Sequence, residues 1–153
     1  MLAPAQAWEF SLRNTGNILF YGELKGEDVT GEIRLRALCR RAPGLDMIVR
    51  LDAMSPDPYF EWPDATASVT ADGGAPVAAD VVTQAAPSFT ATNMGKADAQ
   101  RIVDEIGRGR GEVKVAWGDT VATFDATDAA LAVKGFLTIC DNVPVTGRAV
   151  YGQ

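Results

Sequence analysis

Short stretches of alternating polar and apolar residues recur along the chain and constrain its fold more than any other feature. The clearest are residues 8–13 (WEFSLR) and 32–38 (EIRLRAL). Alternation with a period of two sends successive side chains to opposite faces of an extended strand. One face of each strand is therefore buried and the other meets water, which is typical of antiparallel sheets.

Turn-forming residues separate these stretches at intervals of about ten residues, and this spacing predicts a core made of short strands. Asp72-Gly73-Gly74 and Gly118-Asp119 are expected to form tight hairpin turns, whereas residues 25–28 (KGED) are expected to end the second strand. The predicted strands are residues 8–13, 18–24, 32–38, 46–53, 65–71, 77–83, 88–92, 112–117 and 120–124.

Two segments in the C-terminal half carry a helical pattern instead. In the first, residues 95–108, a stripe of Ala97, Ile102, Val103 and Ile106 is apolar and Gly107 is the expected stop. The second covers residues 127–139, with Thr127 as its N-cap and Asp128 in its first turn. Its buried side is expected to comprise Ala130, Leu131, Phe136, Leu137 and Cys140.

These elements predict a mainly β fold, an antiparallel β-sandwich with two short α-helices in the C-terminal half. A chain of 153 residues fits one domain. We assign the domain to residues 8–140, between a residual signal-peptide or linker segment at 1–7 and a C-terminal tail at 141–153.

Ala5-Gln6-Ala7 matches the small-x-small pattern at which export signals are cleaved. We interpret it as the remnant of such a signal, which predicts a periplasmic or secreted protein. The alternative is a frayed, Ala-rich terminus with no role in export.

The chain has two cysteines, Cys39 and Cys140. In an oxidising compartment they would form one intramolecular disulfide, which would pin the second helix to the sheet. The alternative is two separate buried thiols, as in a cytoplasmic protein with reduced cysteines.

A net charge of −6 and the complete lack of histidine exclude several classes of function. An acidic chain cannot neutralise a run of phosphates, so no nucleic-acid partner is expected. Ser-His-Asp and Cys-His catalytic sites are impossible, and two cysteines are too few for the usual zinc sites. No apolar run approaches the ~20 residues of a membrane helix. We therefore expect no catalytic residue, cofactor, metal or membrane span.

Residues 56–64 (PDPYFEWPD) form a Pro-rich loop that combines aromatic and acidic side chains. Rigid aromatics are enriched at binding hot spots, so Tyr59, Glu61, Trp62 and Asp64 are the predicted binding residues. The alternative is that the aromatic side chains fill the open end of the sandwich. A calcium site is disfavoured because the loop lacks the residue spacing of an EF-hand.

Two further kinds of charged motif are expected to have structural roles and not to bind a ligand. Residues 107–111 (GRGRG) would suit a phosphate, but phosphate-binding loops precede a helix and this segment follows one, so we interpret it as a helix stop and turn. The acid pairs at 27–28 and 104–105 are expected to be solvated, because neighbouring carboxylates do not face each other across a cleft.

The order of these features resembles the invasion-associated locus B-like proteins and the small secretion-accessory proteins of proteobacteria. The matching pieces are Trp8, LRALC (35–39), ADGG (71–74), QRIVDEIGRG (100–109), EVKVAW (112–117) and FDATDAALAVKGFLTIC (124–140). The resemblance implies a β-sandwich core and a periplasmic role without catalysis. The acidic-aromatic loop and the tail depart from the pattern, so no partner identity is carried over.

We therefore expect an exported, non-catalytic binding or structural accessory domain of the bacterial envelope, with another envelope protein or a glycan as its partner. The alternative is a carboxylate-dependent hydrolase acting on cell-wall carbohydrate. Such an enzyme needs two acids about 5 to 9.5 Å apart in a cleft.

Overall fold

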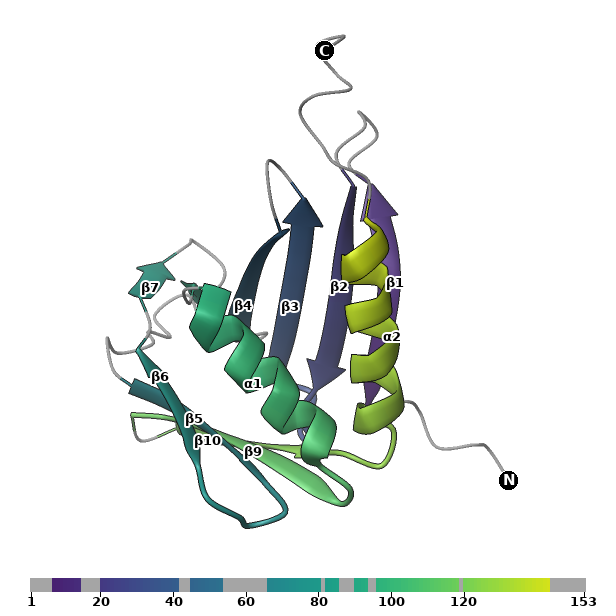
Figure 1. Cartoon of the computed structure of the whole chain (residues 1–153). Helices are drawn as coiled ribbons and strands as arrows, with labels where there is room; N and C mark the ends of the chain where they lie inside the picture. The colour runs from purple at the N-terminus through teal and green to yellow at the C-terminus, as the bar shows by residue number, and fades with distance from the viewer. Residues whose placement is uncertain are drawn as a thin grey trace, which may run out of the picture.

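The computed structural model describes residues 7–14, 20–41, 45–53, 66–80, 82–85, 90–93, 96–118 and 120–143. Within these ranges the chain forms ten strands and two helices (Figure 1). The strands are β1 (Trp8–Asn14), β2 (Phe20–Glu27), β3 (Ile33–Arg41), β4 (Leu45–Ala53), β5 (Thr66–Ala71), β6 (Val77–Asp80), β7 (Val82–Ala85), β8 (Thr90–Asn93), β9 (Glu112–Trp117) and β10 (Thr120–Asp125), and the helices are α1 (Lys96–Arg108) and α2 (Ala129–Asn142).

The strands form two four-stranded antiparallel sheets and a small hairpin. The first sheet has the order β1-β2-β3-β4, so each strand lies beside its neighbour in sequence. The second has the order β10-β9-β5-β6, and β7 pairs with β8 in a two-stranded sheet. The β3–β4 and β9–β10 hairpins lie where alternation and turn residues predict them.

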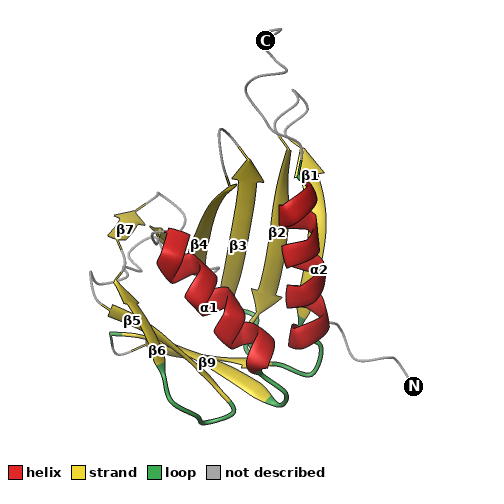
Figure 2. Cartoon of the chain, in the orientation of Figure 1, coloured by secondary structure: helices red, strands yellow, loops and turns green. Residues whose placement is uncertain are grey.

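Both helices lie on the same face of the first sheet, and α1 also reaches the second (Figure 2). Helix α2 packs on β1 and β2, whereas α1 contacts β4 on one side and β5 and β6 on the other. The prediction of a mainly β, sandwich-like fold with two helices in the C-terminal half is confirmed. Neither described helix has the length and apolar character needed to cross a membrane.

The core lies between the helices and the inner faces of the sheets. In β3, Leu35, Ala37 and Cys39 are buried while the residues between them face outward, as alternation requires. The largest buried side chains are Trp8, Trp117, Phe124, Phe136, Leu24, Leu35, Met47, Leu51, Ile102 and Ile106.

Trp8 joins β1 to the second sheet. Its indole Nε1 donates a hydrogen bond to the Asp125 carbonyl oxygen at 2.9 Å, and its ring centroid lies 5.3 Å from that of Phe124 in β10. The side chain is 1% exposed. Burial of a large aromatic with its polar atom satisfied contributes about 1.5–3 kcal/mol.

Glycine at position 26 is a requirement of this packing rather than a strand terminator. A Cβ atom on Gly26 would overlap the Trp8 ring. The predicted break at residues 25–28 is therefore wrong, because β2 continues to Glu27 and the chain turns after Asp28. Glycine normally weakens a strand, but here the close approach of an aromatic ring requires it.

The two helices depart from prediction at their ends and on their faces. Helix α1 buries Ala99 instead of Ala97, and it continues past Gly107 to Arg108. Helix α2 begins later and ends later than predicted, with Asp128 rather than Thr127 at the N-cap and no side-chain capping hydrogen bond.

The buried side of α2 agrees with the predicted one at Phe136 and Cys140 and differs from it in the first half of the helix. Its buried residues are Ala129, Ala132, Val133, Phe136 and Cys140. Leu131 is 71% exposed, because the face of α2 turned toward the sheet carries Ala129, Ala132 and Val133 instead. Hydrophobicity favours burial of Leu131 over Ala132, and the structure buries the smaller residue.

A disulfide joins Cys39 of β3 to Cys140 of α2, with their Cα atoms 5.8 Å apart. The predicted bridge is confirmed, and it pins the second helix to the first sheet. Gly22 of β2 lies beneath it, since a Cβ there would lie 2.8 Å from the Cys39 sulfur.

We expect the Cys39→Ala/Cys140→Ala double variant to lower the free energy of unfolding by about 2–5 kcal/mol, because the bridge closes a long loop in the unfolded chain. Urea unfolding followed by circular dichroism measures this. A reducing agent should shift the wild-type curve by a similar amount and leave the double variant unchanged. Equal stability of the two oxidised proteins would contradict the expectation.

Candidate functional site

The predicted binding residues Tyr59, Glu61, Trp62 and Asp64 belong to the 56–64 loop, which lies outside the described residues. The role of these four residues in binding therefore stays a prediction. The described residues provide a different candidate on the first sheet.

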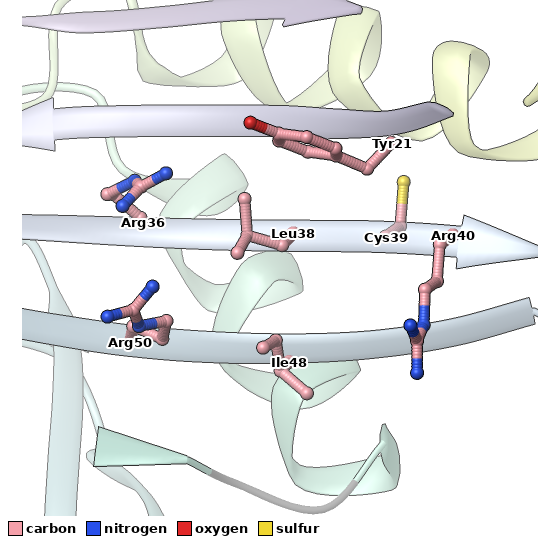
Figure 3. Close-up of a pocket in the computed structure, with 7 residues that line it drawn as sticks. All are labelled: Tyr21, Arg36, Leu38, Cys39, Arg40, Ile48 and Arg50. Atoms are coloured by element: carbon pink, nitrogen blue, oxygen red, sulfur yellow. The ribbon is translucent and has the colours of Figure 1, made fainter. Parts of the chain in front are cut away.

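A pocket of about 430 Å³ lies on the outer face of the first sheet, opposite the helices (Figure 3). This volume falls in the range of small-molecule binding sites. Residues of the three strands β2, β3 and β4 line it, and they are Tyr21, Arg36, Leu38, Cys39, Arg40, Ile48 and Arg50.

Strand register explains why these side chains converge. Leu38 is the cross-strand partner of Ile48, and Arg36 is the partner of Arg50. The apolar pair forms a floor with Tyr21 beside it, and the arginines stand at its two ends, Arg36 and Arg50 at one and Arg40 at the other (Figure 3). Like charges directly opposite each other in a sheet are unfavourable, so this arrangement favours an anion near Arg36 and Arg50.

Glu23 holds Arg36 in place. Its Oε2 accepts hydrogen bonds from Arg36 Nη2 at 2.6 Å and from Nε at 3.1 Å. Glu23 is only 5% exposed, and its other oxygen lies 3.6 Å from Arg13 Nη2. A buried carboxylate between two guanidinium groups fixes the direction of Arg36, and charge-assisted hydrogen bonds are strong.

The pocket is locally basic in an acidic protein. The chain carries a net charge of −6, yet three guanidinium groups surround this pocket. All three arginines also have partners within the protein, and the strand register places Asp46 opposite Arg40. A ligand would therefore add to an existing network of charges rather than meet unpaired cations.

The chemistry of these side chains favours recognition of an anion. Guanidinium groups remain protonated at any physiological pH and offer several donors in a planar fork that matches carboxylate geometry. They do not act as general bases or nucleophiles at neutral pH. An anionic group attached to an apolar body would satisfy the cations and the floor together.

The buried carboxylates elsewhere in the described chain are occupied by structural roles. Asp28 accepts hydrogen bonds from Thr30 Oγ1 at 2.8 Å and from the Glu32 and Ile33 N–H groups at 3.0 Å. Glu105 accepts from the Ala71 N–H at 3.2 Å and from Arg108 Nη1 at 2.9 Å. The prediction that both acid pairs are solvated is wrong for these two residues, which are 7% and 5% exposed.

The described residues contain no cluster of three or more metal-ligating side chains.

The GRGRG segment binds an anion that the chain itself supplies. The Asp72 carboxylate accepts hydrogen bonds from the N–H groups of Glu112 at 3.0 Å, Gly111 at 2.8 Å and Arg110 at 2.8 Å. These bonds lower the pKa of Asp72 below its ordinary value. Asp72 and Gly73 both have positive φ angles, 50° and 70°, as in a type I′ turn, and this turn lies where the sequence predicts a hairpin turn. The turn interpretation therefore accounts for this segment.

Sequence reasoning missed the pocket because its parts are far apart in the chain and none is unusual alone. Alternation in residues 32–38 predicted an outward Arg36, but only the β3–β4 register places Arg50 opposite it. The sequence feature that could have indicated the pocket is the presence of Arg36 and Arg50 on the two strands of one predicted hairpin. An exact register would have been needed to interpret it.

Fold and pocket together define a mainly β, disulfide-linked domain with a basic pocket on the outer face of one sheet. No protein-family model matches the chain, and comparison with curated proteins and with solved structures gives no match either. The resemblance to invasion-associated locus B-like proteins therefore stays a prediction.

We expect Asp72→Asn to lower the thermal midpoint at neutral pH, because the amide nitrogen would face the Arg110 N–H, a donor facing a donor. The lowered pKa of Asp72 means that the stability it contributes is present above its unfolded pKa of about 3.9. That contribution is lost as pH falls through the lower folded pKa. The difference in midpoint between the two proteins should therefore shrink toward pH ~2.

The control for this comparison is Asp104→Asn, since Asp104 is exposed and accepts a hydrogen bond from the Gln100 side chain. It should leave the midpoint nearly unchanged at each pH. A deficit of Asp72→Asn that is constant with pH would argue against the electrostatic account.

Proposed function

We propose that the protein is an exported, non-catalytic binding domain that recognises an anionic group carried beside apolar groups. The observation that carries the proposal is the convergence of Arg36, Arg40 and Arg50 around the Leu38–Ile48 floor. A carboxylate of an acidic segment in another envelope protein has this chemistry.

Export is supported by the Cys39–Cys140 disulfide. Disulfides persist in oxidising compartments and are rare where thiol reductants are abundant. In this proposal the Ala5-Gln6-Ala7 motif marks the processing site of an export signal, and the bridge forms after translocation.

A binding role is supported by the types of side chain in the pocket. Catalysis of hydrolysis needs a group that exchanges protons near neutral pH or a nucleophile, and permanently protonated guanidinium groups provide neither. The buried carboxylates Glu23, Asp28 and Glu105 are each held by structural partners. Within the described residues these observations favour a binding domain over the hydrolase alternative, and Glu61 and Asp64 lie outside them.

Calorimetric titration with a short acidic peptide, glutamate flanked by leucines, tests the proposal. We expect binding of this peptide and no binding of the matched glutamine peptide. A free aliphatic carboxylic acid of similar length forms a second arm, which distinguishes a peptide ligand from a small amphipathic acid.

Variants of the pocket sharpen the test. Arg50→Gln should weaken binding about tenfold or more, because a hydrogen bond to a charged group is lost. Arg34→Gln is the matched control. Arg34 lies on the same face of β3 as Arg36 and pairs with Glu27, but it does not line the pocket. Equal losses in the two variants, or no binding of either acid, would refute an anion site here.

Export is tested on protein isolated from its native cell. Alkylation before reduction should add no label, and alkylation after reduction should add two labels, as measured by intact mass. Labelling of both thiols without reduction would contradict export.

A further inference from the structure

The first sheet has one edge that lacks a neighbouring strand among the described residues. At the opposite edge β8 packs against β4, whereas β1 pairs only with β2. Figure 1 shows β1 at the outer side of the sheet, with α2 over its inner face. An uncovered edge offers its backbone donors and acceptors to a further strand.

The hydrogen bonds of β1 determine which of its backbone groups face outward. The Glu27 N–H donates to the Ala7 carbonyl oxygen at 3.2 Å, so the odd-numbered residues of β1 bond to β2. The N–H and C=O groups of Phe10 and Leu12 therefore point away from the sheet. The Trp8 N–H agrees with this direction, because it reaches Asp128 Oδ2 at 3.4 Å rather than β2.

This edge also carries exposed apolar side chains. Phe10 is 44% exposed and Leu12 is 51% exposed, and Leu131 of α2 lies nearby with 71% exposure. A groove of about 200 Å³ runs between β1 and α2, lined by Trp8, Glu9, Phe10, Asp128, Leu131 and Ala132. Apolar groups gathered along a strand edge are typical of an interface with another chain.

The groove also contains an unsatisfied acceptor. The buried Oδ1 of Asp128 has no hydrogen-bond partner in the described structure. Because Asp128 lies beside the Trp8 backbone, a strand added to this edge would pass close to that oxygen.

The sequence of β1 is complementary to itself in the antiparallel direction. When two copies pair about Ser11, Glu9 of each copy lies opposite Arg13 of the other, and Phe10 lies opposite Leu12. Even-numbered residues then face even-numbered residues, so the outward backbone groups meet in hydrogen-bonded pairs. A shift by two residues in either direction would place Glu9 or Arg13 opposite Ser11 and lose both charge pairs.

We propose that two copies of this protein associate through β1 and join their four-stranded sheets into one continuous antiparallel sheet. The twofold axis passes between the two Ser11 residues, perpendicular to the sheet. Such an axis keeps both α2 helices on the same face, with Leu131 of each copy beside the seam. This association is independent of the proposed function.

Charge complementarity favours a second copy over an unrelated strand. Glu9 already bonds Lys25 at 2.8 Å, and Arg13 lies 3.6 Å from Glu23. The pairing extends these contacts into a row of alternating charges across the seam, and opposite charges facing each other across strands are stabilising.

Sedimentation equilibrium of the full chain at several concentrations tests the proposal. We expect twice the mass of the single chain, and we expect Leu12→Lys to abolish association because a charge replaces an apolar contact in both copies. Val121→Lys is the matched control, since Val121 is 60% exposed on the edge strand β10 of the other sheet. It should leave the mass doubled.

Charge reversal gives a test that does not depend on one variant. Glu9→Arg and Arg13→Glu should each raise the dimer dissociation constant about tenfold or more, because each change creates two like-charge pairs. The combined Glu9→Arg/Arg13→Glu variant restores opposite charges at both pairs and should recover association.

Hydrogen exchange locates the interface. The amides of Phe10 and Leu12 should become protected as concentration rises, whereas that of Ser11 is protected throughout by β2. A monomer at the highest soluble concentration, a dimer insensitive to Leu12→Lys, or a dimer in which those two amides stay unprotected would overturn the proposal. Protection that appears only with an added unrelated chain would assign the edge to that partner instead.

Discussion

The Cys39–Cys140 disulfide is the constraint on which the arrangement of the first sheet depends. It holds α2 above β2 so closely that only glycine fits at position 22. The same close approach recurs at Gly135 of α2, where a Cβ would overlap the Phe10 ring. A glycine inside a helix is unfavourable by itself, but here it lets the helix lie directly on β1 and β2. The position of α2, the glycines at 22 and 135 and the Cys39–Cys140 bond therefore depend on one another.

This arrangement divides the first sheet into two faces with different roles. The inner face is covered by the helices and contributes Trp8, Leu24, Leu35 and Val49 to the core. The outer face carries no covering layer among the described elements, and its charged side chains form cross-strand pairs such as Glu23 with Arg36. Arg36 and Arg50 lie opposite each other on this outer face, where the buried Glu23 carboxylate pairs with Arg36.

The sequence predicted the structure correctly where a local repeat of apolar residues decides between strand and helix. It predicted the alternating strands, both helices and the bridge between Cys39 and Cys140. It failed where contacts with distant elements override a local tendency, as at Gly26, which the Trp8 ring covers, and at Leu131, which stays exposed although α2 packs on β1 and β2. The pocket was missed for the same reason, since cross-strand register is set by the whole sheet and not by either strand.

The contacts of Trp8 have a consequence for how the chain acquires its structure. The indole hydrogen-bonds to a residue 117 positions later, and the Trp8 amide reaches one 120 positions later. A core closed by such distant partners cannot assemble until Asp125 and Asp128 have been synthesised, and topologies of this kind fold slowly. Trp8 therefore reaches its permanent place only after the residues of β10 and the start of α2 have emerged from the ribosome.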